Sequence, residues 1–338
     1  MRNTIHVARF FTAAIAAAAL LVGPQATADD LWVEYEGADG PGKGKHVVFV
    51  TGDEEYRSEE SMPQLAKIAA KYHGFKCTVL FGINKESGEI DPVTVDNIPG
   101  LEALETADLM VLFTRFRELP DEQMKHIVDY TNSGKPIVAL RTATHPFNYR
   151  KNKNSPYAKY SFRSSEFPGG YGRQVLGETW INHYGHHQRE STRGSIVEGM
   201  EKHPIVKGCE DIWGPSDVYG ITTLHGDCKP LIMGHVLVGM NPSDKPNTDK
   251  KPVPVAWTKS YTGEKGKTSR VFTTTMGHGD DLKSEGFRRL LVNSIYWGLE
   301  MEEQIPDRAK VDLIGEYDPA PIGFGGYKKG LKPADHKL

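Results

Sequence analysis

The stretch Gly134–Phe147, GKPIVALRTATHPF, indicates how this chain folds. Residues 136–140 are apolar and partly β-branched, which is typical of a short buried parallel strand, and Gly134 ends the helical pattern before them. The strand is followed at once by four polar residues, Arg141, Thr142, Thr144 and His145. Ligands bind beyond the carboxyl ends of strands in open α/β sheets, so these residues are site candidates. An ordinary hydrogen-bonded turn is the alternative interpretation.

Strand and helix patterns alternate from residue 46 to residue 140. We expect buried strands at 46–51, 76–81, 107–114 and 136–140, and helices at about 58–72, 101–106 and 120–130. This alternation predicts βαβ units with right-handed crossovers. The fold class is therefore α/β, with a parallel sheet covered by helices on both faces.

The second half of the chain is less regular. Residues 148–193 lack long apolar runs, and an irregular segment of this length is usually functional. Strands are expected at 194–197, 231–238, 253–258 and 270–275, the last two forming a hairpin, and a helix at 283–299. We divide the chain into an irregular lead-in (29–45), one domain (46–300) and an extended tail (301–338), partly packed through Tyr317, Phe324 and Tyr327.

Residues 1–28 have the pattern of a secretory signal peptide. Arg2 and Arg9 precede the apolar run Phe10–Val22, and an A-x-A cleavage site ends at Ala28. The run has 13 residues, which is too short for a stable membrane span. We expect cleavage after Ala28 and a secreted or periplasmic protein with no membrane span in the mature form.

The charge balance argues against a nucleic-acid partner. The chain has 41 Lys and Arg against 44 Asp and Glu, and removal of Arg2 and Arg9 leaves 39 against 44, a formal charge of −5. The three cysteines suit an exported chain with one disulfide, for which Cys209 and Cys228 are the better candidates. Cys77 lies in a strand pattern and is expected to be a buried apolar residue.

Polar residues follow three further strand patterns. In a parallel sheet these strand ends lie along one edge, and glycines there allow a close approach to a ligand. The residues expected at this edge, with those after residue 140, include Gly52, Asp53, Glu54, Tyr56, Thr114, Arg115, Arg141, Thr142, His145, His278 and Asp280.

The irregular segment contains a histidine-rich stretch, WINHYGHH, at residues 180–187. Its imidazoles, including those of His183 and His187, could bind a metal or supply a base, or could simply stack on aromatic rings. The HExxH spacing is absent, and we assign no metal. Asp217 and Tyr219 could bring a carboxylate and a phenol to the rim of the pocket. Aromatic residues beside polar groups suit a carbohydrate face, but they also suit ordinary packing. Thr142 stands where a nucleophile elbow would place its side chain, but threonine needs a strong adjacent base.

Several stretches resemble the ThuA-like (trehalose utilisation) family. They are IVALRTATHPF at 137–147, ETWINHYGHH at 178–187, EKHPIVKGCEDIWGPSDVY at 201–219, and RVFTTTMGHGDD at 270–281 followed by FRRLLVNSIYWGLE at 287–300. The resemblance implies a flavodoxin-like, class I glutamine-amidotransferase-like fold without the amidotransferase cysteine. It also implies a role in carbohydrate metabolism, notably of trehalose and 3-keto sugars, and a small-molecule carbohydrate as partner. No cofactor is assigned.

One position departs from the resemblance: many members have a histidine where this chain has Arg141. A guanidinium stays protonated and repels cations, so we expect an anionic or carbonyl-bearing ligand. The implied pocket contains Gly52, Arg141, Thr142, His145, His187, Asp217 and His278.

Three functions follow as hypotheses. The first is an enzyme for a glycoside or keto-sugar, with His278 or His187 as general acid/base and Arg141 as oxyanion stabiliser. In this hypothesis Asp217 orients a histidine or binds sugar hydroxyls. The second is a non-catalytic carbohydrate-binding module. The third is an amidotransferase-like hydrolase that uses Thr142 in place of cysteine.

Overall fold

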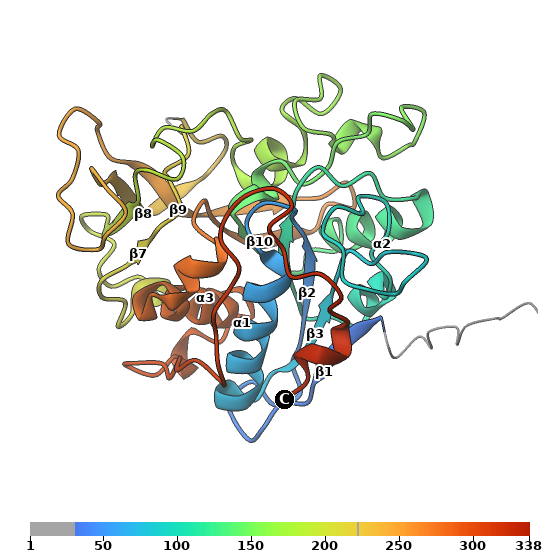
Figure 1. Cartoon of the computed structure of the whole chain (residues 1–338), viewed down its shortest axis with the longest axis horizontal. Coiled ribbons are helices and arrows are strands. Elements are labelled where there is room, and N and C mark those ends of the chain that lie inside the picture. Colours follow the sequence, from blue (N-terminus) through green and yellow to red (C-terminus); the bar gives the residue numbers. More distant parts are fainter. Residues whose placement is uncertain (1–30, 222) are drawn as a thin grey trace, which may run out of the picture.

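The computed structural model describes residues 31–221 and 223–338 (Figure 1). Its sheet has ten strands in the order β1-β3-β2-β4-β5-β10-β9-β8-β6-β7. The strands are β1 Trp32–Tyr35, β2 His46–Gly52, β3 Lys76–Leu80, β4 Leu109–Thr114, β5 Ile137–Leu140, β6 Thr192–Ile196, β7 Trp213–Gly214, β8 Lys229–Val236, β9 Val253–Thr262 and β10 Thr268–Thr274.

The central strands β3, β2, β4, β5 and β10 run parallel, as expected from the alternating patterns. Side chains alternate between the two faces of a strand. In β2, Val47 and Phe49 join the core beneath α1 (Ser58–His73) and α3 (Glu285–Gly298). Val48 and Val50 join the core beneath α2 (Asp121–Thr131). The parallel part of the sheet is therefore covered on both faces, with α1 and α3 side by side (Figure 1).

The sheet is larger and more mixed than a flavodoxin-like sheet. Strands β9, β8, β6 and β7 extend it beyond β10 in antiparallel pairing, so the fold is a mixed α/β sheet with a parallel centre. At the other edge β1 pairs antiparallel with β3. The expectation of an irregular lead-in is wrong at residues 32–35, because this short alternating segment gains its hydrogen bonds only from the β3 edge.

The expected disulfide is absent from the structure, in which Cys77, Cys209 and Cys228 are all free. Cys209 is buried against α3, where its sulfur lies 3.9 Å from Asn293 Nδ2. Cys228 donates to the carbonyl of His225 beside β9. The two cysteines thus lie in separate surroundings, Cys209 buried and Cys228 only half-buried, and are not paired.

The C-terminal segment runs back across α1 (Figure 1). The phenol of Tyr317 donates to the carbonyl of Gly279, and Ala320 N–H donates to Glu60 at the start of α1. Phe324, which we expected to pack, is 66% exposed. The predicted signal peptide lies outside the described residues. Among the described residues, no helix combines the length and the apolar character that a membrane crossing needs.

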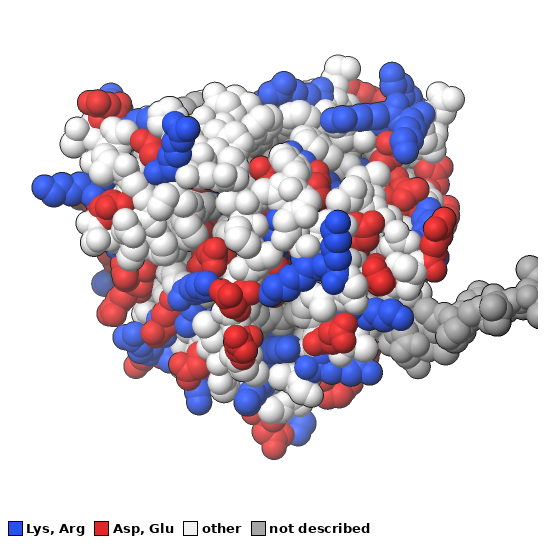
Figure 2. Space-filling view, viewed as in Figure 1, with Lys and Arg blue, Asp and Glu red and all other residues white. Residues whose placement is uncertain are grey.

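Charges of both signs are interspersed on the face shown in Figure 2. Lys and Arg do not gather there into one large basic area.

Candidate functional site

Four strand ends meet at one edge of the sheet, as the sequence predicts. The neighbours β2, β4, β5 and β10 are parallel, so the loops after them lie together. The N–H of Arg115 donates to the carbonyl of Gly52 at 2.8 Å, which ties the first two loops. A Cβ at Gly277 would lie 3.3 Å from Arg141 Cβ, and its φ of 150° suits glycine. Glycine therefore allows the loops after β5 and β10 to touch.

Arg141 is wholly buried at the centre of this edge. Its guanidinium lies between two aromatic rings, 4.4 Å from the centre of Tyr56 and 3.8 Å from that of Tyr219. It donates to the carboxylate and carbonyl of Asp217, to the carbonyl of Thr275 and to the Tyr56 hydroxyl. Only its Nε lacks a protein partner. The expected oxyanion role has little support in this geometry, which makes Arg141 a positioning residue.

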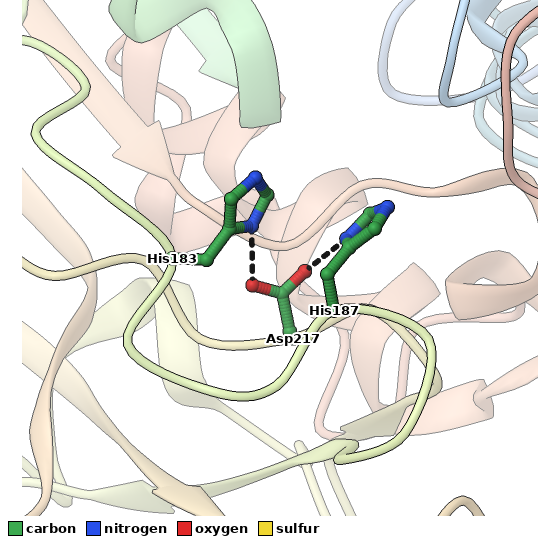
Figure 3. A group of neighbouring side chains, drawn as sticks. All are labelled: His183, His187 and Asp217. Carbon is green, nitrogen blue, oxygen red and sulfur yellow. Dashed lines mark hydrogen bonds and ion pairs between the residues drawn. The ribbon is translucent and has the colours of Figure 1, made fainter.

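The carboxylate of Asp217 holds two imidazoles, one on each oxygen (Figure 3). His183 Nδ1 lies 2.7 Å from Oδ2, and His187 Nδ1 lies 2.9 Å from Oδ1. Burial would raise the pKa of Asp217, but the charge of Arg141 and the two imidazole hydrogen bonds outweigh it and hold the pKa well below its usual range. Asp217 is thus a fixed anion that fixes which nitrogen of each ring carries the inner proton.

The backbone explains why these two histidines converge. His183 forms a bridge with Tyr219, and the N–H groups of Tyr184 and Gly185 both donate to Val218 O. A Cβ at Gly185 would meet the Asp217 side chain at 3.1 Å, so glycine permits the close approach. The ring centres of His183 and His187 are 4.7 Å apart.

The two imidazoles have different surroundings. His187 is also 3.4 Å from Glu55, through its Nε2, whereas His183 contacts only the one carboxylate. The hydrogen bonds to Asp217 and Glu55 raise the pKa of His187 to about 9. His187 is therefore a cation at neutral pH. The His183 side chain is 33% exposed, and its outer nitrogen faces away from Asp217 (Figure 3).

His278 approaches the same centre from the loop after β10. The ring of His278 lies edge-on to the ring of Tyr56, with the two ring centres 6.3 Å apart. The ring of His187 also lies edge-on to Tyr56, at 6.0 Å between centres. Nδ1 of His278 accepts the N–H of Asp280, which leaves the proton on Nε2, a buried atom with no hydrogen-bond partner among residues 31–221 and 223–338. Burial lowers the pKa of His278 to about 4. His278 is thus a neutral imidazole that can donate through Nε2. It is not available as the expected base, because the lone pair on its Nδ1 already accepts the N–H of Asp280.

The remaining predicted residues support the site or lie beside it. Thr142 is fully buried and donates to Asp53, whose pKa burial raises to about 6. This pair joins the loops after β2 and β5. His145 is enclosed by Phe116, Phe162, Trp180 and Tyr219, and burial lowers its pKa well below the usual range.

Two predicted ligand contacts have other partners. Asp280 pairs with Lys283 at 2.9 Å. Gly52 has its open side filled by Arg117.

Glu55 was not singled out in the sequence, although it bridges Arg115 and His187. It stands in the polar loop GDEEYR, and nothing in that run distinguishes it from Glu54. Glu55 acquires its second partner, His187, only because the fold places the histidine-rich segment next to the loop after β2.

Backbone strain is concentrated around this edge. Among the described residues, seven other than glycine have positive φ, and five are Arg57, Phe116, Arg141, Arg163 and Gln188 around the site. Such conformations cost on the order of 1–3 kcal/mol each and cluster at functional sites. A surface hollow beside α2 contains none of the site residues described above, and we place the site at the strand ends.

Three side chains of the site are also candidate metal ligands. His183, His187 and Asp217 offer ligand atoms within 4.8 Å of one another. Both carboxylate oxygens already accept imidazole protons, and Arg141 adds a fixed positive charge at 2.7 Å from Oδ1. A cation would have to displace two protons beside that guanidinium. The donor set fits a hydrogen-bonded carboxylate better than a metal centre, and we derive no step through a metal.

Comparison with known proteins gives one extensive match. The family model ThuA, described as trehalose utilisation, matches residues 45–298. Comparison with curated protein sequences gives no match.

Among solved structures, a ThuA-like protein from Parabacteroides merdae ATCC 43184 is 15% identical, with 88% of this chain and 100% of that chain covered and a TM-score of 0.47. A ThuA-like protein from Bacteroides uniformis ATCC 8492 is 15% identical, with coverage of 78% and 94% and a TM-score of 0.44. PurLQS from Thermotoga maritima is 11% identical, with coverage of 75% and 99% and a TM-score of 0.38. These scores are too low to add to the family match. On that match, the chain belongs to the ThuA (trehalose utilisation) family.

Proposed function

We propose that this protein is an exported enzyme of carbohydrate metabolism that performs acid/base chemistry on a glycoside or keto-sugar. The observation that carries the proposal is the shared carboxylate of Asp217. It holds His183 and His187 side by side, with His187 charged and His183 open to a ligand. A charged imidazole beside one that is open to a ligand suits acid/base chemistry at a single site.

Each imidazole then has a role. A proton on the carbon beside a sugar carbonyl passes to Nε2 of His183, whose Nδ1 keeps its own proton and donates it to the Asp217 carboxylate. Negative charge develops on the carbonyl oxygen, and the Nε2–H of His278 stabilises it together with the positive charge of His187 nearby. Among the described residues, Nε2 of His278 has no hydrogen-bond partner and can donate to the ligand, whereas Nε2 of His187 faces Glu55 at 3.4 Å. The resulting enolate can be protonated again or can expel a neighbouring oxygen substituent.

A carbohydrate-binding protein without catalysis is the second candidate. The aromatic residues around His145 support it, because amphipathic rings suit a sugar face. The hydrolase alternative lacks such support. The hydroxyl of Thr142 is buried and donates to Asp53, so it is not available as a nucleophile.

One pair of variants separates catalysis from binding. His183→Ala should reduce turnover of a keto-sugar roughly 100- to 10,000-fold, the usual contribution of a general base. Sugar affinity, measured by calorimetry, should change little. His186→Ala is the matched control, since this exposed histidine lies on the same loop outside the cluster. Equal turnover by wild type and His183→Ala would contradict the enzyme, and wild-type binding without turnover would favour the binding protein.

Export rests on the pattern of residues 1–28. Mass spectrometry of the mature protein should find Asp29 as the first residue. A mature chain that retains Phe10–Val22 would overturn this part of the proposal.

A further inference from the structure

A closed circuit of residue contacts lies beside Glu55, and we call it the entrance ring. Along the part of the circuit that leads from Phe324 to His187, the centres of neighbouring rings or guanidinium groups are separated by 4.7–5.6 Å. Gln188, which follows His187, then approaches Gly323 and closes the circuit. Its members, in order, are Phe324, Arg115, Phe116, His145, Trp180, His183, His187, Gln188 and Gly323. Glu55 lies 3.4 Å from Arg115 through Oε2 and 3.4 Å from His187 through Oε1. The C-terminal segment is thus part of the site.

The protein fixes the backbone of this segment firmly. Arg57, which is wholly buried with a φ of 65°, donates to the carbonyls of Pro321 and Gly323. Gly323 N–H donates in turn to Glu55 O at 3.0 Å. A buried arginine in a strained conformation is therefore used to hold a surface segment against the loop after β2.

The side chain that this segment presents is nevertheless open. Phe324 is 66% exposed, with Gly323 and Gly325 at φ 131° and 72° on either side. One face of its ring lies over the Arg115 guanidinium at 5.0 Å, and Phe116 covers that guanidinium at 4.7 Å. Hydrophobic burial does not explain this aromatic ring, since most of its surface is in water.

We infer that Phe324 is a binding residue that stacks against the pyranose ring of the substrate. The inference rests on the proposed carbohydrate function and names a contact for it. The C–H face of a pyranose is apolar, whereas its hydroxyl edge is polar. The entrance ring matches both, because the aromatic face of Phe324 lies over Arg115, which in turn pairs with Glu55.

The way in which Phe324 is held also affects the cost of ligand binding. Phe324 is held by the buried contacts of Arg57 and not by its own burial. Its ring is therefore already in place before a sugar arrives, and little ordering is required on binding. Removal of the ring should change ligand affinity without changing the stability of the fold.

The test measures binding of the sugar that wild type binds best, by calorimetry on the full mature chain. Phe324→Ala should weaken affinity roughly tenfold, the scale of one aromatic contact. Phe324→Trp should restore it and report binding through a change in fluorescence. Val238→Ala, at another exposed apolar residue, is the control and should bind as wild type does.

The possible outcomes separate the two claims. Equal affinities for wild type and Phe324→Ala, with unchanged unfolding midpoints, would overturn the role of Phe324 and leave the proposed function standing. A wild type that binds no sugar at all would overturn both. Loss of binding in Phe324→Ala that Phe324→Trp does not restore would also count against stacking.

Discussion

Arg141 and Asp217 form an ion pair in which both side chains are completely shielded from solvent. Nη2 of Arg141 lies 2.7 Å from Oδ1 of Asp217, and Nη1 lies 2.6 Å from its carbonyl oxygen. One arginine thus fixes both the side chain and the backbone of the residue that holds the two imidazoles. Arg141 is therefore part of the support for the two histidines.

Replacement of Arg141 by lysine should be far more harmful than the retained charge suggests. Lysine cannot supply the planar fork that reaches Asp217 twice, or stack between Tyr56 and Tyr219. Leaving one buried charge without its partner typically costs about 3–5 kcal/mol. Urea unfolding should show a loss of this order together with lost turnover.

Arg308→Lys is the matched control for this change. Arg308 pairs with Glu285 and Glu210 at the surface, where ion pairs contribute about 0–1 kcal/mol. Its unfolding free energy should stay near that of wild type. If Arg141→Lys were equally mild, the buried pair would not be what organises the site.

The charge of His187 predicts how stability depends on pH. Its pKa is about 9 in the folded protein against an ordinary 6.5. A raised pKa means that the stabilisation is fully present below pH 6.5 and is lost as the pH rises through 9. The separation sets an upper limit of about 3 kcal/mol.

The comparison is between wild type and His187→Gln, by urea unfolding at pH 6, 7.5 and 9. Wild type should be the more stable protein at pH 6, and its advantage should shrink steadily toward pH 9. An advantage that stays constant over this range would show that His187 is not held as a cation by Asp217 and Glu55.

The sequence predicted the parallel centre of the fold well, because buried parallel strands are continuous apolar runs. Those at 46–51, 107–114 and 136–140 correspond to β2, β4 and β5. Strand β1 was missed, since Trp32–Tyr35 is short and is stabilised by the neighbouring edge of β3. The antiparallel extension was only partly visible, because β6 and β8 alternate weakly.

The site was predicted in its membership more than in its roles. His183, His187, Asp217 and His278 do converge, as strand ends and a long insertion suggest. Their charge states depend on partners that sequence spacing does not reveal, such as Glu55 beside His187. Phe324 was expected to pack but is exposed. Its exposure could not be predicted, because it depends on how Arg57 holds the chain beside it.

The thiol content gives an independent check of the fold. Because the structure places Cys209 against α3 and Cys228 beside β9, titration of the unreduced, denatured protein should find three thiols. In the native protein Cys77 and Cys209 should be slow to react, since both are buried and burial raises their pKa. A single thiol after denaturation would restore the disulfide that the sequence suggested.

The central claim is that His183, held by Asp217, removes a proton from a sugar carbon beside a carbonyl. The most direct measurement is deuterium incorporation from D₂O into a 3-keto sugar such as 3-keto-trehalose, followed by NMR. Exchange depends on proton removal alone and does not require the later steps.

Wild type and His186→Ala should both incorporate deuterium at the carbon next to the carbonyl. His183→Ala should incorporate deuterium at least roughly 100-fold more slowly, as expected for the loss of a general base. Wild-type protein that binds the keto-sugar without exchanging this proton, or equal exchange by His183→Ala, would contradict the account.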